Sequence, residues 1–189
     1  LWDPAKFNYP WLDDVPPLKR AFLLSDYNDA TEGIGVERMV FLQCDTAADQ
    51  SVDEARWVAE IAQSDPRIRA IVAAAPLEKG DAARDVLDAL SAVPNVRGVR
   101  RLIQAEDDPF CIEPDFVRGV QMLADYDMSF DICIKGDGQF ANVLELVRQC
   151  PNVRFILDHI GKPYIADATT EPWSGYITQL AAMPNTWCK

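Results

Sequence analysis

Residues 151–157, Pro-Asn-Val-Arg-Phe-Ile-Leu, decide the fold that we expect for this chain. The proline stops a preceding helix, the asparagine suits a turn, and a run of branched and aromatic residues then begins a strand. Similar tetrapeptides stand at 66–69, 94–97 and 184–187. Their spacing is about 30 residues, or about twice that where an extra strand lies between, and about 30 residues make one βα unit. The repeat therefore predicts strands that alternate with helices and pair in parallel.

The stretches between these repeats carry the matching helical pattern. Apolar residues recur at helical spacing in five segments, which predict helices at 53–61, at 83–90, from Pro114 onward, at 140–147 and at 177–181. Six short apolar runs predict strands at 38–43, 68–73, 96–103, 129–134, 153–157 and near 186.

Two α/β architectures fit such an alternation, an open doubly wound sheet and a closed barrel. The Gly-x-Gly-x-x-Gly turn of a dinucleotide-binding sheet is absent from the sequence. Polar residues follow several strands instead, which is how a barrel builds its active site. We therefore expect one domain over residues 1–189 with the (β/α)8 TIM-barrel fold. A closed barrel has eight strands over about 250 residues, so we expect this chain to lack strands one and eight.

The composition excludes several partners. A net charge of −12 disfavours nucleic acid and anionic membranes, both of which need clustered Lys and Arg. No apolar run approaches the roughly 20 residues of a membrane span. The five cysteines form no Cys-x-x-Cys pair and are odd in number, which favours reduced thiols in the cytoplasm. The partner that remains is a small molecule.

Polar residues at the predicted strand ends are the candidate site residues. His159 is the only histidine and lies just after the strand predicted at 153–157. Strand alternation puts it on the face of Phe155 and Leu157, with Asp158 on the opposite face. Arg100 shares a face with Val96 and Gly98, so we expect it in the pocket and Arg101 outside; the alternative is that both form surface ion pairs.

Three further polar residues follow the same reasoning. Gln43 ends its strand, where it can bond a ring hydroxyl or only a local turn. Lys135 is expected to meet the substrate, whereas Asp131 lies deeper on the same face and is expected to pair internally.

Residues 157–163, Leu-Asp-His-Ile-Gly-Lys-Pro, resemble the signature of the amidohydrolase-2 family of TIM-barrel hydrolases. The closer likeness is to its lactonase branch, the relatives of L-fuconolactonase, L-rhamnono-lactonase and 2-pyrone-4,6-dicarboxylate lactonase. Weaker matches fall in the family's order at 1–4, 9–12, 98–101 and 184–189. The resemblance places the family's His-x-His before Leu1 and its catalytic aspartate beyond Lys189.

The resemblance implies a hydrolase that opens a sugar-acid or dicarboxylate lactone. It makes His159 the catalytic residue, which binds a metal or polarises the substrate carbonyl. Asp158 and Lys162 support it from either side, and Trp2 lines the pocket. It leaves the cofactor open between one divalent metal, such as zinc, and none; a single imidazole is expected to be too little for a three-ligand zinc site.

Two alternatives stay open. One is a metal-dependent decarboxylase of the same superfamily. The other is an inert partial barrel that binds a partner, or its own copies as a homo-oligomer, through open strand edges. For the isolated chain we expect neither turnover nor a stable monomer.

Overall fold

The centre of the protein is a sheet of six strands, all parallel and in sequence order. The computed structural model describes residue 9 and residues 12–189. This arrangement confirms the predicted topology and brings the carboxyl ends of all the strands to one edge. The strands are β1 (Met39–Leu42), β2 (Ile68–Ala73), β3 (Val96–Val99), β4 (Ser129–Ile132), β5 (Arg154–Leu157) and β6 (Thr186–Cys188).

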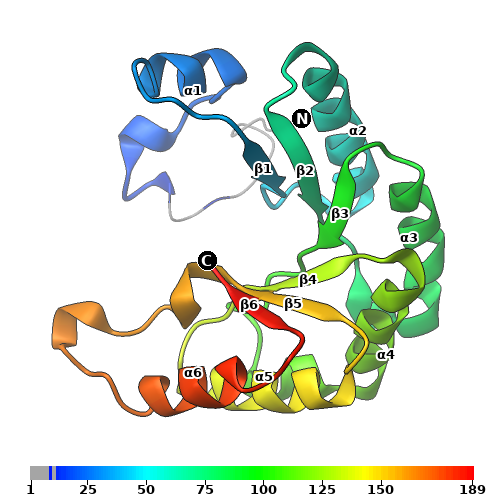
Figure 1. Cartoon of the computed structure of the whole chain (residues 1–189), viewed down its shortest axis with the longest axis vertical. Coiled ribbons are helices and arrows are strands. Elements are labelled where there is room, and N and C mark those ends of the chain that lie inside the picture. The colour runs from blue at the N-terminus through cyan, green and yellow to red at the C-terminus, as the bar shows by residue number, and fades with distance from the viewer. Residues whose placement is uncertain (1–8, 10–11) are drawn as a thin grey trace.

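The sheet curls into an open arc, and α2 to α6 run along its outer side (Figure 1). All five predicted helices are present, and the curled parallel sheet confirms the α/β class and the partial TIM barrel. A further short helix, α1, precedes β1 and was not predicted. The helices are α1 (Leu24–Ala30), α2 (Ser51–Ser64), α3 (Arg84–Ser91), α4 (Pro114–Met122), α5 (Asp137–Gln149) and α6 (Trp173–Ala181).

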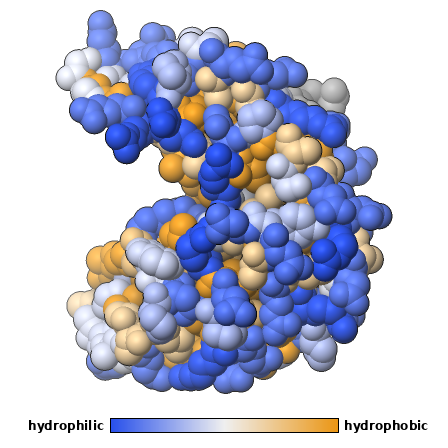
Figure 2. Space-filling view, turned by 45° about the vertical axis from the view of Figure 1, so that its right-hand side comes forward, coloured by the Kyte–Doolittle hydropathy of each residue, from blue (hydrophilic) through white to orange (hydrophobic). Residues whose placement is uncertain are grey.

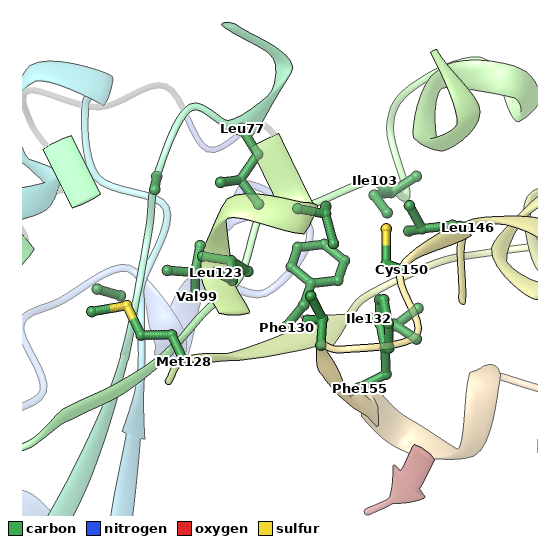
Figure 3. Packing of buried hydrophobic residues seen from close by; sticks show 14 of the residues in the cluster. Leu77, Val99, Ile103, Leu123, Met128, Phe130, Ile132, Leu146, Cys150 and Phe155 are labelled. Atoms are coloured by element: carbon green, nitrogen blue, oxygen red, sulfur yellow. The ribbon is translucent and has the colours of Figure 1, made fainter. Parts of the chain in front are cut away.

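The main core lies between the sheet and these helices (Figure 3). Phe130 of β4 is fully buried and meets Phe155 of β5 and Phe116 of α4 edge to face, with ring centroids 6.0 and 5.9 Å apart. Such pairs add about 0.5–1.5 kcal/mol to the free energy of burial. Since Phe130 and Phe155 face outward, alternation turns Asp131 and Ile156 toward the inner face of the arc.

The inner face and the two outermost strands are only partly covered. Val40 of β1 and Trp187 of β6 are each more than half exposed. An apolar groove of about 630 Å³ runs beside β1, and its lining includes Phe22, Met39 and Trp57. The space-filling view shows the surface hollowed on the open side of the arc (Figure 2). Self-association through these edges stays a prediction. No helix among the described residues is long and apolar enough to span a membrane.

A glycine in α4 allows this helix to lie close against the backbone of a neighbouring helix. A Cβ built on Gly119 would lie 2.1 Å from the carbonyl oxygen of Leu77, in the short helix Leu77–Ala83 that follows β2. Because backbone cannot move aside as a flexible side chain can, we expect Gly119→Ala to lower the free energy of unfolding by about 1–3 kcal/mol or more. Urea denaturation measures this. Gly35→Ala is the control, since its Cβ would meet nothing within 4 Å.

Candidate functional site

A belt of alternating charges crosses the inner face near the carboxyl ends of β3 to β6. Arg100 donates through Nη1 to Asp158 Oδ2 at 3.0 Å, and Lys189 donates through Nζ to Asp131 Oδ2 at 2.6 Å. Lys189 Nζ also lies 3.0 Å from Asp158 Oδ1. The Asp158 side chain is fully buried, and that of Arg100 is 12% exposed. The four residues therefore form one charge-balanced cluster that ties four strands together.

The buried position of the belt changes the acidity of its members. Burial raises the pKa of Asp131, although the hydrogen bond from Lys189 opposes this shift. Burial works against the charge on Lys189, but Asp131 and Asp158 outweigh it and raise the pKa of the ammonium. Two buried atoms of the belt have no partner among the described residues, namely Arg100 Nε and Asp131 Oδ1, whereas Asp158 Oδ1 lies in the ion pair with Lys189. The belt thus leaves one donor and one acceptor for a further polar group.

His159 lies directly beside the belt, at the carboxyl end of β5. Its ring nitrogen, a carboxylate oxygen of Asp158 and Cys133 Sγ lie within 4.8 Å of one another. The prediction that alternation separates His159 from Asp158 is wrong, because the strand ends at Leu157. His159 then adopts a left-handed backbone with φ of 53°, as does Ile160 with φ of 48°. This turn brings an exposed imidazole next to a buried carboxylate.

Cys133, just past β4, joins the site and was not among the predicted residues. It is buried, and its sulfur accepts a hydrogen bond from Lys162 Nζ at 3.5 Å. Lys162 Nζ also donates to Gln104 Oε1. Lys162, which was expected to support His159, therefore contacts Cys133 and Gln104. The donor types of Cys133, Asp158 and His159 are ones that zinc binds, so three candidate ligands lie together here. The expectation that a single imidazole is too little for a three-ligand zinc site stays a prediction.

A cavity of about 360 Å³ opens at the ends of β1 to β3, and both Arg100 and Arg101 line it. Arg101 was expected outside the pocket. It reaches the cavity because β3 ends at Val99, so strand alternation no longer governs the next two residues. Nη2 of Arg100 donates to the Gln43 carbonyl oxygen at 2.7 Å. With Asp158 on Nη1, both terminal nitrogens of Arg100 are already engaged within the protein.

The other predicted residues lie in different settings. Gln43 lines the cavity, but its side-chain oxygen accepts a hydrogen bond from the Asp45 backbone, so it makes the local turn contact. Lys135 is exposed just past β4, and its backbone N–H donates to Gln139 at 2.9 Å. Asp131 pairs internally with Lys189, as expected. Trp2 lies outside the described residues.

Two residues of the site escaped sequence reasoning for different reasons. Lys189 ends the chain beyond a short predicted strand, so no pattern marked the face it would occupy. Cys133 lies in the apolar run 129–134, a setting typical of a buried thiol, which fits its burial but gives no sign of its polar neighbours. Strand register is the signal that links them. Ile132 and Cys188 both pair with Leu157, so the residues that follow them, Cys133 and Lys189, flank Asp158.

Comparison with known proteins finds similar proteins that are named as lactonases. The chain is 28% identical over its whole length to an L-fucono-1,5-lactonase from Burkholderia ambifaria, and it spans 64% of that protein. An L-rhamnono-gamma-lactonase from Scheffersomyces stipitis is 26% identical over 96% of the chain, which spans 68% of it.

Among solved structures, an amidohydrolase from Burkholderia multivorans with bound zinc superposes with a TM-score of 0.82. That match has 27% identity over 95% of this chain and 63% of the other. The sequence profile described as amidohydrolase, Amidohydro_2, matches residues 2–189. This chain, with its partial barrel and its polar residues at the strand ends, therefore belongs to the amidohydrolase family.

Proposed function

We propose that the protein is a hydrolase that opens a small lactone. The observation that carries this proposal is the exposed imidazole of His159 beside a buried, charge-balanced belt at the carboxyl ends of the strands. The two similar proteins named as lactonases support the same chemistry. Because the chain spans only about two thirds of their length, the activity of the whole protein stays a proposal.

In this proposal His159 is the group that transfers protons during ring opening. Ring opening needs a proton at the leaving alkoxide oxygen and removal of one from the attacking water, and a positioned imidazole can act as general acid or as general base. Arg100 and Lys189 fix the position of Asp158, and Asp158 presents a negative charge close to the ring. That charge stabilises the imidazolium that forms when His159 accepts a proton.

We propose a divalent metal such as zinc as the cofactor, because three side chains with metal-binding donor atoms lie together beside the belt. Cys133, Asp158 and His159 would hold it, and the zinc bound in the similar Burkholderia multivorans structure supports the assignment. A metal there supplies Lewis acidity to the lactone carbonyl. Arg100 and Lys189 compete for Asp158, so we expect Cys133 and His159 to be the principal ligands that this chain provides.

We also propose a cytoplasmic location, which the five unpaired cysteines support. The proposed partner is a small lactone or carboxylate rather than nucleic acid or a membrane, and a homo-oligomer is the proposed assembly.

The proposal predicts lactone opening by the product of the complete gene. Purified protein is assayed by the acid released from five- and six-membered sugar lactones and from a dicarboxylate lactone, each before and after dialysis against a chelator. We expect turnover of at least one lactone, and zinc measured by mass spectrometry before dialysis. Release of carbon dioxide from an aromatic acid, without lactone opening, would instead indicate the decarboxylase reaction.

A further inference from the structure

Arg101 lies between two carboxylates at the wall of the 360 Å³ cavity. Its Nε donates to Glu78 at 3.1 Å, its Nη2 donates to Glu106 at 2.6 Å, and its Nη1 donates to the Leu102 carbonyl oxygen. The guanidinium carbon lies 5.0 Å from the ring centroid of Phe110. Every nitrogen of this guanidinium thus has a partner within the protein.

The two glutamates come from different connections of the sheet. Glu78 follows β2 and Glu106 follows β3, so the pair holds Arg101 from two sides. The side chains of Arg101, Glu78 and Glu106 are 26%, 31% and 33% exposed. Arg101 and Glu78 line the cavity, and Glu106 holds Arg101 from beside it. An ion pair this exposed adds little stability. A role in ligand selection explains the arrangement better than a role in folding.

The charges that line the cavity sum to zero. Asp45 and Glu78 are negative, and Arg100 and Arg101 are positive. Arg100 is already held by Asp158 and the Gln43 carbonyl. A ligand that carries a carboxylate therefore meets two guanidinium groups whose terminal nitrogens are already paired, and nearby like charges, which costs binding energy. An uncharged ligand with hydroxyl groups meets carboxylate oxygens that can accept its hydrogen bonds.

We propose that Glu78 and Glu106 set the charge selectivity of this pocket. By pairing with Arg101 they withhold it from carboxylate ligands, and the pocket then favours uncharged lactones. The identity of the ligand rests on the proposed lactonase function, whereas the charge effect does not.

The test removes the two negative charges without changing side-chain shape. Glu78→Gln and Glu106→Gln are combined in the product of the complete gene, and binding of 2-pyrone-4,6-dicarboxylate is measured by calorimetry. A freed guanidinium makes charge-assisted hydrogen bonds to a carboxylate, so we expect the Kd to fall by about tenfold or more. We expect kcat/KM for an uncharged sugar lactone to fall or stay unchanged.

Three controls make the result specific. Glu145→Gln removes the same charge from an exposed position on α5, beside Arg148, and should leave the Kd unchanged. Adding Arg101→Gln to the double variant should return the Kd to the starting value. Glu106→Gln alone should shift it in the same direction by a smaller factor, because Glu78 still holds Nε.

The outcomes separate this inference from the proposed function. An unchanged Kd in a double variant that melts at the normal temperature overturns the inference, as does tight dicarboxylate binding by the unaltered protein. A lower Kd that reverts with Arg101→Gln supports it, even where no lactone is opened by any variant. In that last case the proposed function fails and the charge selectivity stands.

Discussion

Replacing Asp158 with alanine is expected to lower the free energy of unfolding by about 3–5 kcal/mol, the range seen when one member of a buried ion pair is removed. The Asp158 side chain is fully buried and contacts two cations, Arg100 and Lys189. Without it, Arg100 keeps its charge in a position that is only 12% exposed. Urea denaturation of the product of the complete gene measures the change.

An exposed pair at the other end of the same strands gives the matched control. Asp127 pairs with Arg154 at 2.6 Å, but the two side chains are 87% and 47% exposed. Asp127→Asn, which suits the left-handed backbone of this position with φ of 53°, should therefore cost no more than about 1 kcal/mol. A double variant, Asp158→Leu with Arg100→Met, should recover much of the loss, since apolar pairs of similar volume often replace buried ion pairs without penalty. Equal losses for Asp158→Ala and Asp127→Asn would contradict the buried belt.

The sequence was sufficient for the architecture because the βα repeat is a local pattern. Each Pro-Asn pair marks the end of one helix and the start of the next strand, and the apolar spacing between them is periodic. Parallel pairing follows from the alternation itself. The helix Leu24–Ala30 lacked such a signal: it is a short, largely exposed helix without a continuous apolar stripe.

The site was only partly predictable, because its residues lie just past the strand ends. Alternation correctly turned Asp131 toward the inner face, since Asp131 is within β4. It failed at Arg101 and at His159, which follow the last residues of β3 and β5. Whether an arginine is free or paired also depends on loops that are distant in sequence, as with Glu78 and Arg101. Pairing of this kind leaves no pattern in a single sequence.

His159 is the residue for which we expect the largest loss of activity. His159→Asn should lower kcat/KM for lactone opening by about 10²–10⁴-fold, the usual contribution of a positioned acid–base group. Asparagine is the appropriate replacement because position 159 has φ of 53°, and asparagine accepts the left-handed region more readily than most residues. The residue is exposed, so the melting temperature should change little.

Two further measurements show which role His159 plays. When His159 transfers protons, the pH dependence of kcat/KM loses one of its limbs, while the zinc content stays the same. When it is chiefly a ligand, the zinc content falls together with the activity. Lys135→Ala, another exposed change at the same end of the sheet, serves as the comparison because it removes no group from the Cys133, Asp158 and His159 cluster. A His159→Asn variant with activity within threefold of the unaltered protein would show that the imidazole is not part of the reaction.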